Sequence, residues 1–525
     1  MIATNRNSIE KFQFYHRLCL NLISFINETN ISAPLHYYKI TLHLTHEIMK
    51  TKIAVLIMFL LATQGAWAQV MFHRHYGGGA DDYGIKVLQT SDGGYLVAAI
   101  TESFGAGYRD IFLIKTSDLG DTLWTRTIGG TGGEQPSALK VTSDNQFIIA
   151  GSTGSKGAGG YDVYLLKIDQ NGDTIWTRTY GGIEDEDGCD VIETIDGGYL
   201  VVGGTRSFAT GSSSMYAIKT NSVGDTLWTK TYTKKSSNIC SSVVQLSDSG
   251  YFFVGQTLLP GQISTSDCYF VRTDMAGDTI WTKTYGGADY DGAFLVYKEN
   301  GGNIVISGTT KSFGAGGFDI FLSMFNINGE EIWIKTYGGA LDDYGGIFSP
   351  TTDGGYIISG YTENYGAGNQ DMFLIKTDTF GDTLWTRTFG GYNDEWSGSV
   401  IQTLDNGFII SGYSNSFGNG IEVYLVKTNP EGISGLPQII PQNIQYEVYP
   451  NPGNGQFNIE FEDPNSTAMK VEVFDHAGKL VFEKNGINRQ GNVYPLSLAG
   501  FPSGSYLLQV TTSKGCAVTK LVIQK

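Results

Sequence analysis

Acidic side chains recur in this sequence at two fixed positions, and their types and spacing could support chemistry. Both positions are counted from a repeated tryptophan phrase, such as "NGDTIWTRTYGG" at residues 171–182. Carboxylate pairs can act as acid and base in glycoside hydrolysis, and clustered carboxylate oxygens can bind Ca²⁺. Ten residues after the tryptophan, or after Phe72 in the first copy, stand Asp82, Glu134, Glu186, Asp291, Asp343 and Glu395. Fourteen residues before it stand Asp110, Asp162, Asp267, Asp319 and Asp371, with Glu422 as the counterpart in the last copy.

Two interpretations of these acidic positions are open from the sequence. In the structural one, the carboxylates accept hydrogen bonds from backbone N–H groups of glycine-rich loops such as "SFGAG" at 103–107. In the functional one, they form an acidic ring on one rim that favours Ca²⁺ or a cationic or polyhydroxylated ligand. The oxygens that would bind Ca²⁺ belong to Glu186, Asp187, Asp289 and Asp291, although their spacing is not that of an EF-hand loop. No other cofactor is expected.

Histidine is missing from the sequence between Gly77 and Asp475. This excludes Ser-His-Asp catalysis, Cys-His catalysis and His-ligated zinc from the repeats. Only carboxylate pairs remain for catalysis, and because they recur in every unit, no pair is singled out. We therefore expect a binding protein more than an enzyme and assign no catalytic residue. A glycoside hydrolase that uses two of these carboxylates remains the alternative.

The elements that must position these side chains are four short strands per repeat. The tryptophans stand at 124, 176, 228, 281, 333 and 385, so the period is 52 or 53 residues. Within one unit, alternating or continuous apolar runs predict strands at 83–90, 95–101, 110–116 and 122–128. Asp and Gly between these runs supply the positive-φ positions that tight hairpins need. Four strands in about 50 residues is the size of a propeller blade.

The number of units predicts an all-β, seven-bladed propeller over residues 69–429. Full units follow six of the seven phrases, whereas the unit after Trp385 contains only three strands. The leftover phrase at 70–78 supplies the missing fourth strand, and its pairing with the last unit would remove two free sheet edges. The tryptophan is expected to pack between blades. The basic residue two positions later, at 74, 126, 178, 230, 283, 335 and 387, is expected to guard an outer edge strand.

Composition and cysteine usage narrow the possible functions. The chain of 525 residues has a net charge of −17, which argues against nucleic acid as a partner. Cys189, Cys240, Cys268 and Cys516 lie in the folded part and form no CxxC pair. We expect free thiols, and a bridge between Cys189 and Cys240 remains open.

The region before the repeats predicts export. Residues 49–68 have a basic start, an apolar run at 53–62 and a small-residue pattern at Ala66-Trp67-Ala68. These are the parts of a signal peptide that is cleaved between Ala68 and Gln69. The apolar run is too short to span a bilayer, so no transmembrane span is expected after its removal. Residues 1–48 match nothing downstream and are interpreted as a mis-called or disordered extension.

The C-terminal region ends the repeats and predicts a second domain. Residues 430–444 form a Pro- and Gly-containing linker, and alternating strands over 445–525 predict a small immunoglobulin-like β-sandwich. The motif residues are Pro450, Asn451 and Pro452, then Gly478, Lys479 and Leu480, then Gly504, Tyr506 and Lys520. With these residues the segment resembles the type A C-terminal sorting domain of the Bacteroidota type IX secretion system.

That resemblance implies a route through the periplasm and the outer membrane, with the type IX machinery as a partner. It implies a secreted or cell-surface location and leaves the role of the propeller open. The first hypothesis is a binding module for a glycan or a protein. The carbohydrate-active enzyme is the second, and a structural or adhesive surface protein is the third.

Overall fold

The computed structural model describes residues 70–434, with gaps at 235–236, 259–264 and 419, and residues 446–525, with gaps at 462–467, 475–479, 486–492 and 513–514. The predictions for residues 1–68, for the cleavage site at Ala68 and Gln69, and for most of the linker therefore lie outside the described residues. Each of the two described parts is considered by itself.

Residues 72–428 fold into repeated four-stranded antiparallel sheets. In the first, β2 (Asp82–Gln89), β3 (Tyr95–Thr101), β4 (Asp110–Thr116) and β5 (Thr122–Ile128) are hydrogen-bonded in chain order. The next are β6 (Glu134–Val141), β7 (Phe147–Thr153), β8 (Asp162–Ile168), β9 (Thr174–Tyr180); β10 (Glu186–Glu193), β11 (Tyr199–Thr205), β12 (Ser214–Thr220), β13 (Thr226–Tyr232); and β14 (Ser237–Gln245), β15 (Tyr251–Leu258), β16 (Ser266–Thr273), β17 (Thr279–Tyr285). They are followed by β18 (Asp291–Lys298), β19 (Ile304–Thr310), β20 (Asp319–Phe325), β21 (Glu331–Tyr337), and by β22 (Asp343–Pro350), β23 (Tyr356–Thr362), β24 (Asp371–Thr377), β25 (Thr383–Phe389).

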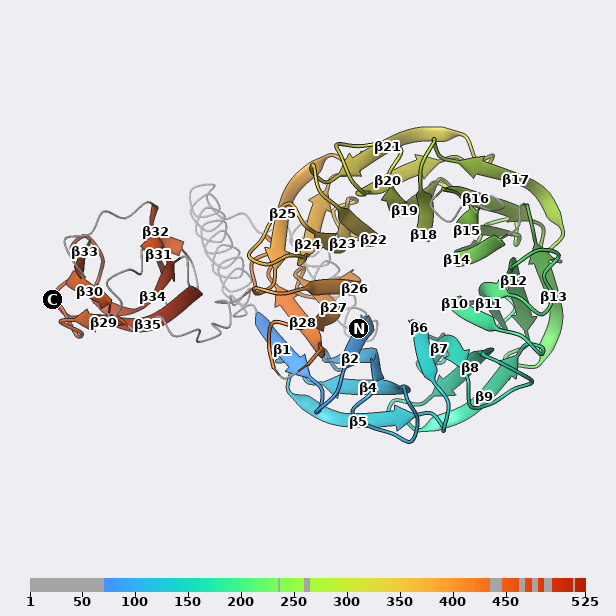
Figure 1. Ribbon diagram of the computed structural model, residues 1–525, viewed down its shortest axis with the longest axis horizontal. Helices are drawn as coiled ribbons and strands as arrows, with labels where there is room; N and C mark the ends of the chain where they lie inside the picture. The colour runs from blue at the N-terminus through green and yellow to red at the C-terminus, as the bar shows by residue number, and fades with distance from the viewer. Residues whose placement is uncertain are drawn as a thin grey trace, which may run out of the picture. The chain divides into compact units, whose positions relative to one another are not determined.

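The last of these sheets combines the two ends of the repeat region. It has the order β1-β28-β27-β26, from β1 (Phe72–Tyr76), β26 (Glu395–Gln402), β27 (Phe408–Ser414) and β28 (Glu422–Thr428). Strand β1 runs antiparallel to β28. The predicted pairing of the N-terminal segment with the last unit is thus present. The sheets surround a central opening with β2, β6, β10, β14, β18, β22 and β26 innermost, which is a β-propeller arrangement (Figure 1).

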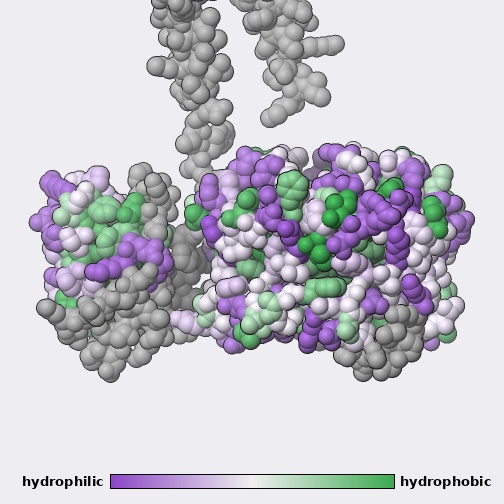
Figure 2. Space-filling model, turned by 90° about the horizontal axis from the view of Figure 1, so that it is seen from above, coloured by the Kyte–Doolittle hydropathy of each residue, from purple (hydrophilic) through white to green (hydrophobic). Residues whose placement is uncertain are grey.

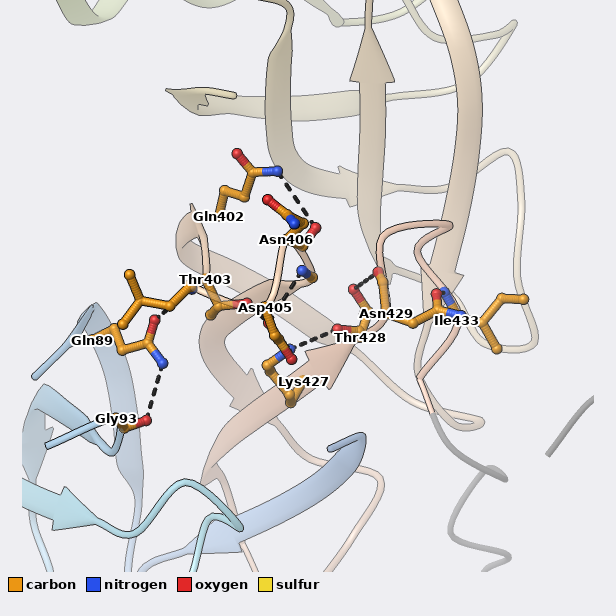
Figure 3. A network of polar contacts seen from close by, with 12 residues as sticks. Gln89, Gly93, Gln402, Thr403, Asp405, Asn406, Lys427, Thr428, Asn429 and Ile433 are labelled. Carbon is orange, nitrogen blue, oxygen red and sulfur yellow. Dashed lines mark hydrogen bonds and ion pairs between the residues drawn. The ribbon is translucent and has the colours of Figure 1, made fainter. Parts of the chain in front are cut away.

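Polar contacts also link the last sheet to the first. The backbone N–H of Leu404 donates to Oε1 of Gln89 at 2.8 Å, and the N–H of Asp82 donates to the carbonyl of Ile421 at 2.8 Å. Within the last sheet, Nζ of Lys427 lies 2.9 Å from Oδ2 of Asp405 (Figure 3). Such a Lys–Asp or Arg–Asp pair ties the third strand to the first hairpin in most of the sheets, and in sheet β18–β21 a methionine, Met324, stands at the lysine position.

The tryptophan phrase joins each outer strand to the next sheet. A Cβ atom at Gly172 would lie 2.5 Å from the ring of Trp124, so only glycine fits where the next hairpin crosses that ring. Arg126 stands two residues after Trp124, and its Nε lies 3.6 Å from Oδ1 of Asp173, which is in the same hairpin as Gly172. The tryptophan therefore packs between sheets as predicted, and the basic residue pairs with an acid of the neighbouring sheet.

The core lies between neighbouring sheets. One cluster joins Leu96 and Ile111 of the first sheet to Ile149 and Leu166 of the second, and all four side chains are fully buried. Strands β3 and β4 have neighbours on both faces, which explains why they read as continuous apolar runs. On the outer side of the ring that Figure 2 shows, apolar residues are scattered among hydrophilic ones. Single exposed apolar residues are normal for a soluble surface.

The cysteine side chains that the structure describes are free thiols. Cys240 and Cys268 are buried, and Cys189 is half-buried. The bridge between Cys189 and Cys240 is therefore not formed, whereas the side chain of Cys516 lies outside the described residues. Burial raises the pKa of the Cys189 thiol to about 12.

The C-terminal part forms two antiparallel sheets that share one core. The first contains β29 (Tyr446–Tyr449), β30 (Gln456–Phe461) and β33 (Val493–Ser497); the second contains β31 (Ala468–Phe474), β32 (Leu480–Asn485), β34 (Gly504–Thr512) and β35 (Gly515–Ile523). Ile459 and Leu496 from the first sheet meet Val471, Leu508 and Leu521 from the second in one buried cluster.

Candidate functional site

The two acidic sets lie at one end of the propeller and meet in pairs at the junctions between sheets. Asp162 opens β8 and Glu186 opens β10 in the next sheet. A Cβ atom at Gly181 would lie 1.9 Å from Oδ1 of Asp162 and 2.4 Å from Oε2 of Glu186, so both carboxylates converge on this glycine. The same convergence joins Asp110 with Glu134, Asp267 with Asp291, Asp319 with Asp343, and Asp371 with Glu395, at Gly129, Gly286, Gly338 and Gly390. We call this end of the propeller the loop end.

The carboxylates at the loop end hold the glycine-rich loops. Oε2 of Glu186 accepts from the N–H of Gly182 at 2.7 Å, and its Oε1 accepts from Oγ1 of Thr205 at 2.7 Å. Oδ2 of Asp162 accepts from the N–H of Ala158 at 2.9 Å. Ten of the twelve predicted residues are at most 2% exposed, and Asp267 and Glu422 are half-buried. These hydrogen bonds are those of the structural interpretation, and ligand binding by the acidic set stays a prediction.

Burial and like charge raise the pKa at several of these junctions. For Asp371 the pKa rises to about 6, mainly because burial penalises the charged form and then because Glu395 is close. The pKa values of Asp162, Asp319 and Glu422 are raised for the same two reasons, with Glu186, Asp343 and Asp82 as the neighbouring charges. Glycoside hydrolysis uses two carboxyl groups with different pKa values. Asp371 is only 2% exposed, however, so a substrate oxygen has little access to it.

The predicted calcium ligands are not gathered in one place by side-chain geometry. Among the described residues there is no group of three or more His, Cys, Asp or Glu side chains arranged to hold a metal ion. Glu186 is engaged by its loop, and Oδ1 of Asp187 accepts from Oγ of Ser152 at 3.2 Å. Asp289 is exposed and its backbone N–H donates to Ser312. Calcium binding through Glu186, Asp187, Asp289 and Asp291 remains a prediction.

A row of aromatic side chains, which the sequence reasoning missed, crosses the loop end. We define the aromatic row as Tyr290, Phe318, Tyr344, Tyr361, Trp396, Tyr413 and Tyr83. Successive ring centroids are 5.0–5.9 Å apart, from Tyr290 through to Tyr83. Trp396 is 38% exposed and the others are half-buried. The row spans four neighbouring sheets, from β18–β21 through the last sheet to β2–β5.

Polar groups stand beside the aromatic row. Nε1 of Trp396 donates to Oε1 of Gln370, whose Nε2 donates to Oε1 of Glu363 at 2.8 Å. At the other end, the guanidinium of Arg109 lies 5.5 Å from the ring centroid of Tyr83. Aromatic surface with amide, carboxylate and guanidinium groups at its margin offers both stacking and hydrogen bonding to a ligand.

The aromatic row is not part of the repeat. Tyr83, Tyr344 and Trp396 stand one residue after the recurring acid of the innermost strand. The other sheets have Gln135, Asp187, Ile239 and Gly292 at that position. The signal was present in the sequence, but it lies in departures from the repeat and not in what recurs.

The C-terminal motif residues mostly hold that domain together. Nδ2 of Asn451 donates to the carbonyl of Lys520 at 2.6 Å, and its Oδ1 accepts from the N–H of Val522 at 3.0 Å. The hydroxyl of Tyr506 donates to the carbonyl of Pro502 at 2.9 Å. Gly504 opens β34, whereas Gly478, Lys479 and the side chain of Leu480 lie outside the described residues.

Residues 447–524 match the family of secretion system C-terminal sorting domains. This confirms the resemblance to the type IX sorting domain, and the chain is therefore a β-propeller protein with a type IX sorting domain, exported to the cell surface or the medium. The sorting domain also implies interaction with the type IX secretion machinery. Within the described residues, no helix has both the length and the apolar character to cross a membrane.

The propeller is similar to known proteins at low sequence identity. A curated relative, the regulatory protein FlaEY of Caulobacter vibrioides, is 22% identical over 328 residues, which is 58% of this chain. The chain spans about a third of that relative's length, since the match covers 32% of it. Among solved structures, the Neurospora crassa Pan2 WD40 domain is 11% identical with a TM-score of 0.38, covering 70% of this chain and 99% of that one. The β-propeller domain of the Trilobed protease from Pyrococcus furiosus is 9% identical with a TM-score of 0.40, covering 69% and 98%.

Proposed function

We propose that this protein is an exported, closed seven-bladed propeller that binds a glycan at its loop end without cleaving it. Residues 49–68 would act as the signal peptide, with cleavage between Ala68 and Gln69. The sorting domain would form an immunoglobulin-like sandwich that passes the propeller to the type IX machinery. The observation that carries the binding role is the aromatic row, because it is confined to four neighbouring sheets and breaks the repeat.

The chemistry of the row favours a polyhydroxylated ligand. Sugar rings present C–H faces that pack on aromatic surface, and their hydroxyls pair with amides and carboxylates such as Gln370 and Glu363. The chain's net charge of −17 disfavours strongly anionic polymers. A neutral or amino-bearing glycan that lies along the row would contact Trp396 near its middle and Arg109 at its end.

A residue that recurs in every blade stabilises that blade, whereas a residue that occurs in few blades is available to contact a ligand. The buried acidic pairs belong to the first kind, because each holds its own loop. The glycoside hydrolase alternative needs two carboxylates that a substrate can reach. At the loop end, the half-buried Glu363 stands beside the aromatic row, and its Oε1 accepts from Nε2 of Gln370 at 2.8 Å.

A glycan array tests the proposal with the chain from Gln69 onward, its Trp396→Ala variant and a Phe380→Ala control. Phe380 is exposed in the hairpin between β24 and β25, away from the row. We expect at least a tenfold loss of glycan affinity in Trp396→Ala, about 1.4 kcal/mol, and none in Phe380→Ala. Equal affinity in both variants, or no glycan bound at all, would refute the row as a glycan site. Release of reducing ends would favour the hydrolase.

A further inference from the structure

The innermost strands enclose a cavity in the central opening, farther from the loop end than the aromatic row is. It has a volume of about 350 Å³ and is lined by residues from all the innermost strands. A second hollow of about 590 Å³, which shares Leu88, Val141 and Ile401 with it, continues to the hairpins at residues 89–91 and 402–406. The cavity is therefore reachable from the end of the propeller opposite the loop end. Its volume lies in the range of small-molecule sites, about 300–1,000 Å³.

One side of this cavity is cationic. Lys86 on β2 and Lys140 on β6 both line it. Nζ of Lys140 lies 3.6 Å from Oδ1 of Asp190, whose Oδ2 accepts from Oγ of Ser242 at 2.8 Å. Among the residues that line the cavity, Lys86 and Lys140 carry positive charge and Asp190 is the one carboxylate. The charge left over on this wall is positive, in a chain whose net charge is −17.

The electrostatics of Lys86 agree with this excess. Its pKa is lowered to about 8, first by burial and then by the charge of Lys140. An anion at this wall would relieve the repulsion between the two ammonium groups and would be held by both of them.

The opposite side of the cavity is aromatic. Phe294 and Tyr297 on β18 line it, whereas Phe348 on β22 is 4% exposed and packs in the core between sheets. Strands β18 and β22 lie across the central opening from β2 and β6 (Figure 1). A molecule in the cavity would therefore meet charge at one end and apolar ring surface at the other.

Neither side is a product of the repeat. In the other innermost strands the position of Lys86 is taken by Ala138, Asp190, Ser242, Leu295, Ile347 and Ser399. The position of Lys140 is taken by Leu88, Ile192, Val244, Tyr297, Ser349 and Ile401. The lysines occur on two adjacent sheets, and Phe294 and Tyr297 occur on one sheet that faces them.

We propose that this cavity binds an amphipathic organic anion. Its carboxylate or sulfonate group pairs with Lys86 and Lys140, and its aromatic or acyl body packs on Phe294 and Tyr297. The site shares no residue with the glycan site that we propose at the loop end, although the ring centroid of Phe294 lies 5.7 Å from that of Tyr344 in the aromatic row.

The test uses the fluorescent probe 1-anilinonaphthalene-8-sulfonate and the chain from Gln69 onward. We expect saturable binding of one probe per chain, weakened at least tenfold in Lys86→Met with Lys140→Met. The control Lys234→Met removes one positive charge from an exposed lysine on the loop before β14, away from the cavity, and should bind the probe as the parent does. N-phenyl-1-naphthylamine, which has the same aromatic body without the sulfonate, should bind more weakly than the sulfonate to the parent chain.

Unchanged probe affinity in the double variant, or no saturable binding by the parent, would overturn the proposal. So would equal affinity for the neutral analogue, because the lysines would then play no part. Far-ultraviolet circular dichroism of each variant serves as the control for folding. Glycan binding by the double variant distinguishes the two proposals, because it should persist whether or not the cavity binds the probe.

Discussion

The junction glycine Gly181 offers the sharpest test of the acidic pairs. Its absent side chain is what allows Asp162 and Glu186 to approach each other, since a Cβ atom there would lie 1.9 Å and 2.4 Å from their oxygens. In Gly181→Ala both carboxylates must rotate away. The contacts at risk are the 2.7 Å bond from the N–H of Gly182 and the 2.9 Å bond from the N–H of Ala158.

The expected cost follows from those two contacts. Leaving a buried polar group without its partner costs about 1–3 kcal/mol, so two such losses predict a decrease of about 2–6 kcal/mol in the free energy of unfolding. Gly204→Ala in β11 of the adjoining sheet is the matched control, because a Cβ atom there has no neighbour within 4 Å. That substitution should change stability by no more than about 1 kcal/mol. Urea unfolding followed by tryptophan fluorescence measures both.

The chain itself contains the compensating set of residues. At one junction the acids are replaced by Ser214 and Asn238, and Thr233 then occupies the glycine position, with its Oγ1 2.6 Å from Oγ of Ser214. Introducing Asp162→Ser and Glu186→Asn together with Gly181→Thr should therefore recover most of the stability that Gly181→Thr alone removes. If Gly181→Ala were as stable as Gly204→Ala, or if the triple variant were no more stable than Gly181→Thr, the convergence of the two carboxylates would not be what requires glycine.

Three further outcomes are expected. The pKa of Asp371 is raised to about 6 from an ordinary 3.8. The stability that this carboxyl group contributes is therefore complete below pH 3.8 and is lost as the pH rises through 6. Urea unfolding between about pH 4 and 7 should show this loss in the parent and not in Asp371→Asn. Lys376→Met should lower the free energy of unfolding by about 1–3 kcal/mol, because the ammonium group pairs with Asp353 and donates to the carbonyl of Thr377. In a double-mutant cycle, Asp353→Asn should destabilise the Lys376→Met variant less than it destabilises the parent. A chain that starts at Gly77 lacks β1 and leaves β28 as an open edge, so size-exclusion chromatography should show oligomers or aggregates; a monomer as stable as the parent would contradict the role of β1.

The fold could be predicted because its determinants are local and repeated. Alternation, hairpin glycines and the 52-residue period give the strands, and the one strand missing from the unit after Trp385 points to the pairing of β1 with β28. The location of both acidic sets at one end also followed from strand order. Their pairing did not, because the convergence of Asp162 and Glu186 on Gly181 depends on how neighbouring sheets pack, which the period does not encode.

The aromatic row and the cationic wall could not be predicted by reasoning from what recurs. Trp396 and Lys86 occupy positions that hold other residue types in most units, so a search for recurring chemistry passes over them. Their significance depends on which sheets become neighbours around the opening. Tyr413 and Tyr83 are 330 residues apart in the sequence, yet their ring centroids lie 5.1 Å apart because the last sheet adjoins the first.

A repeat protein therefore supplies its own internal comparison. Where positions change together, as Gly181, Asp162 and Glu186 do against Thr233, Ser214 and Asn238, the coupled change identifies contacts that hold the sheets together. Other positions change singly, and yet the unusual residues gather in space, as Lys86 and Lys140 do opposite Phe294. Packing between sheets does not require such a change. Such a gathering exposes charge and ring surface to the opening at a cost in burial, and binding a complementary molecule would offset that cost.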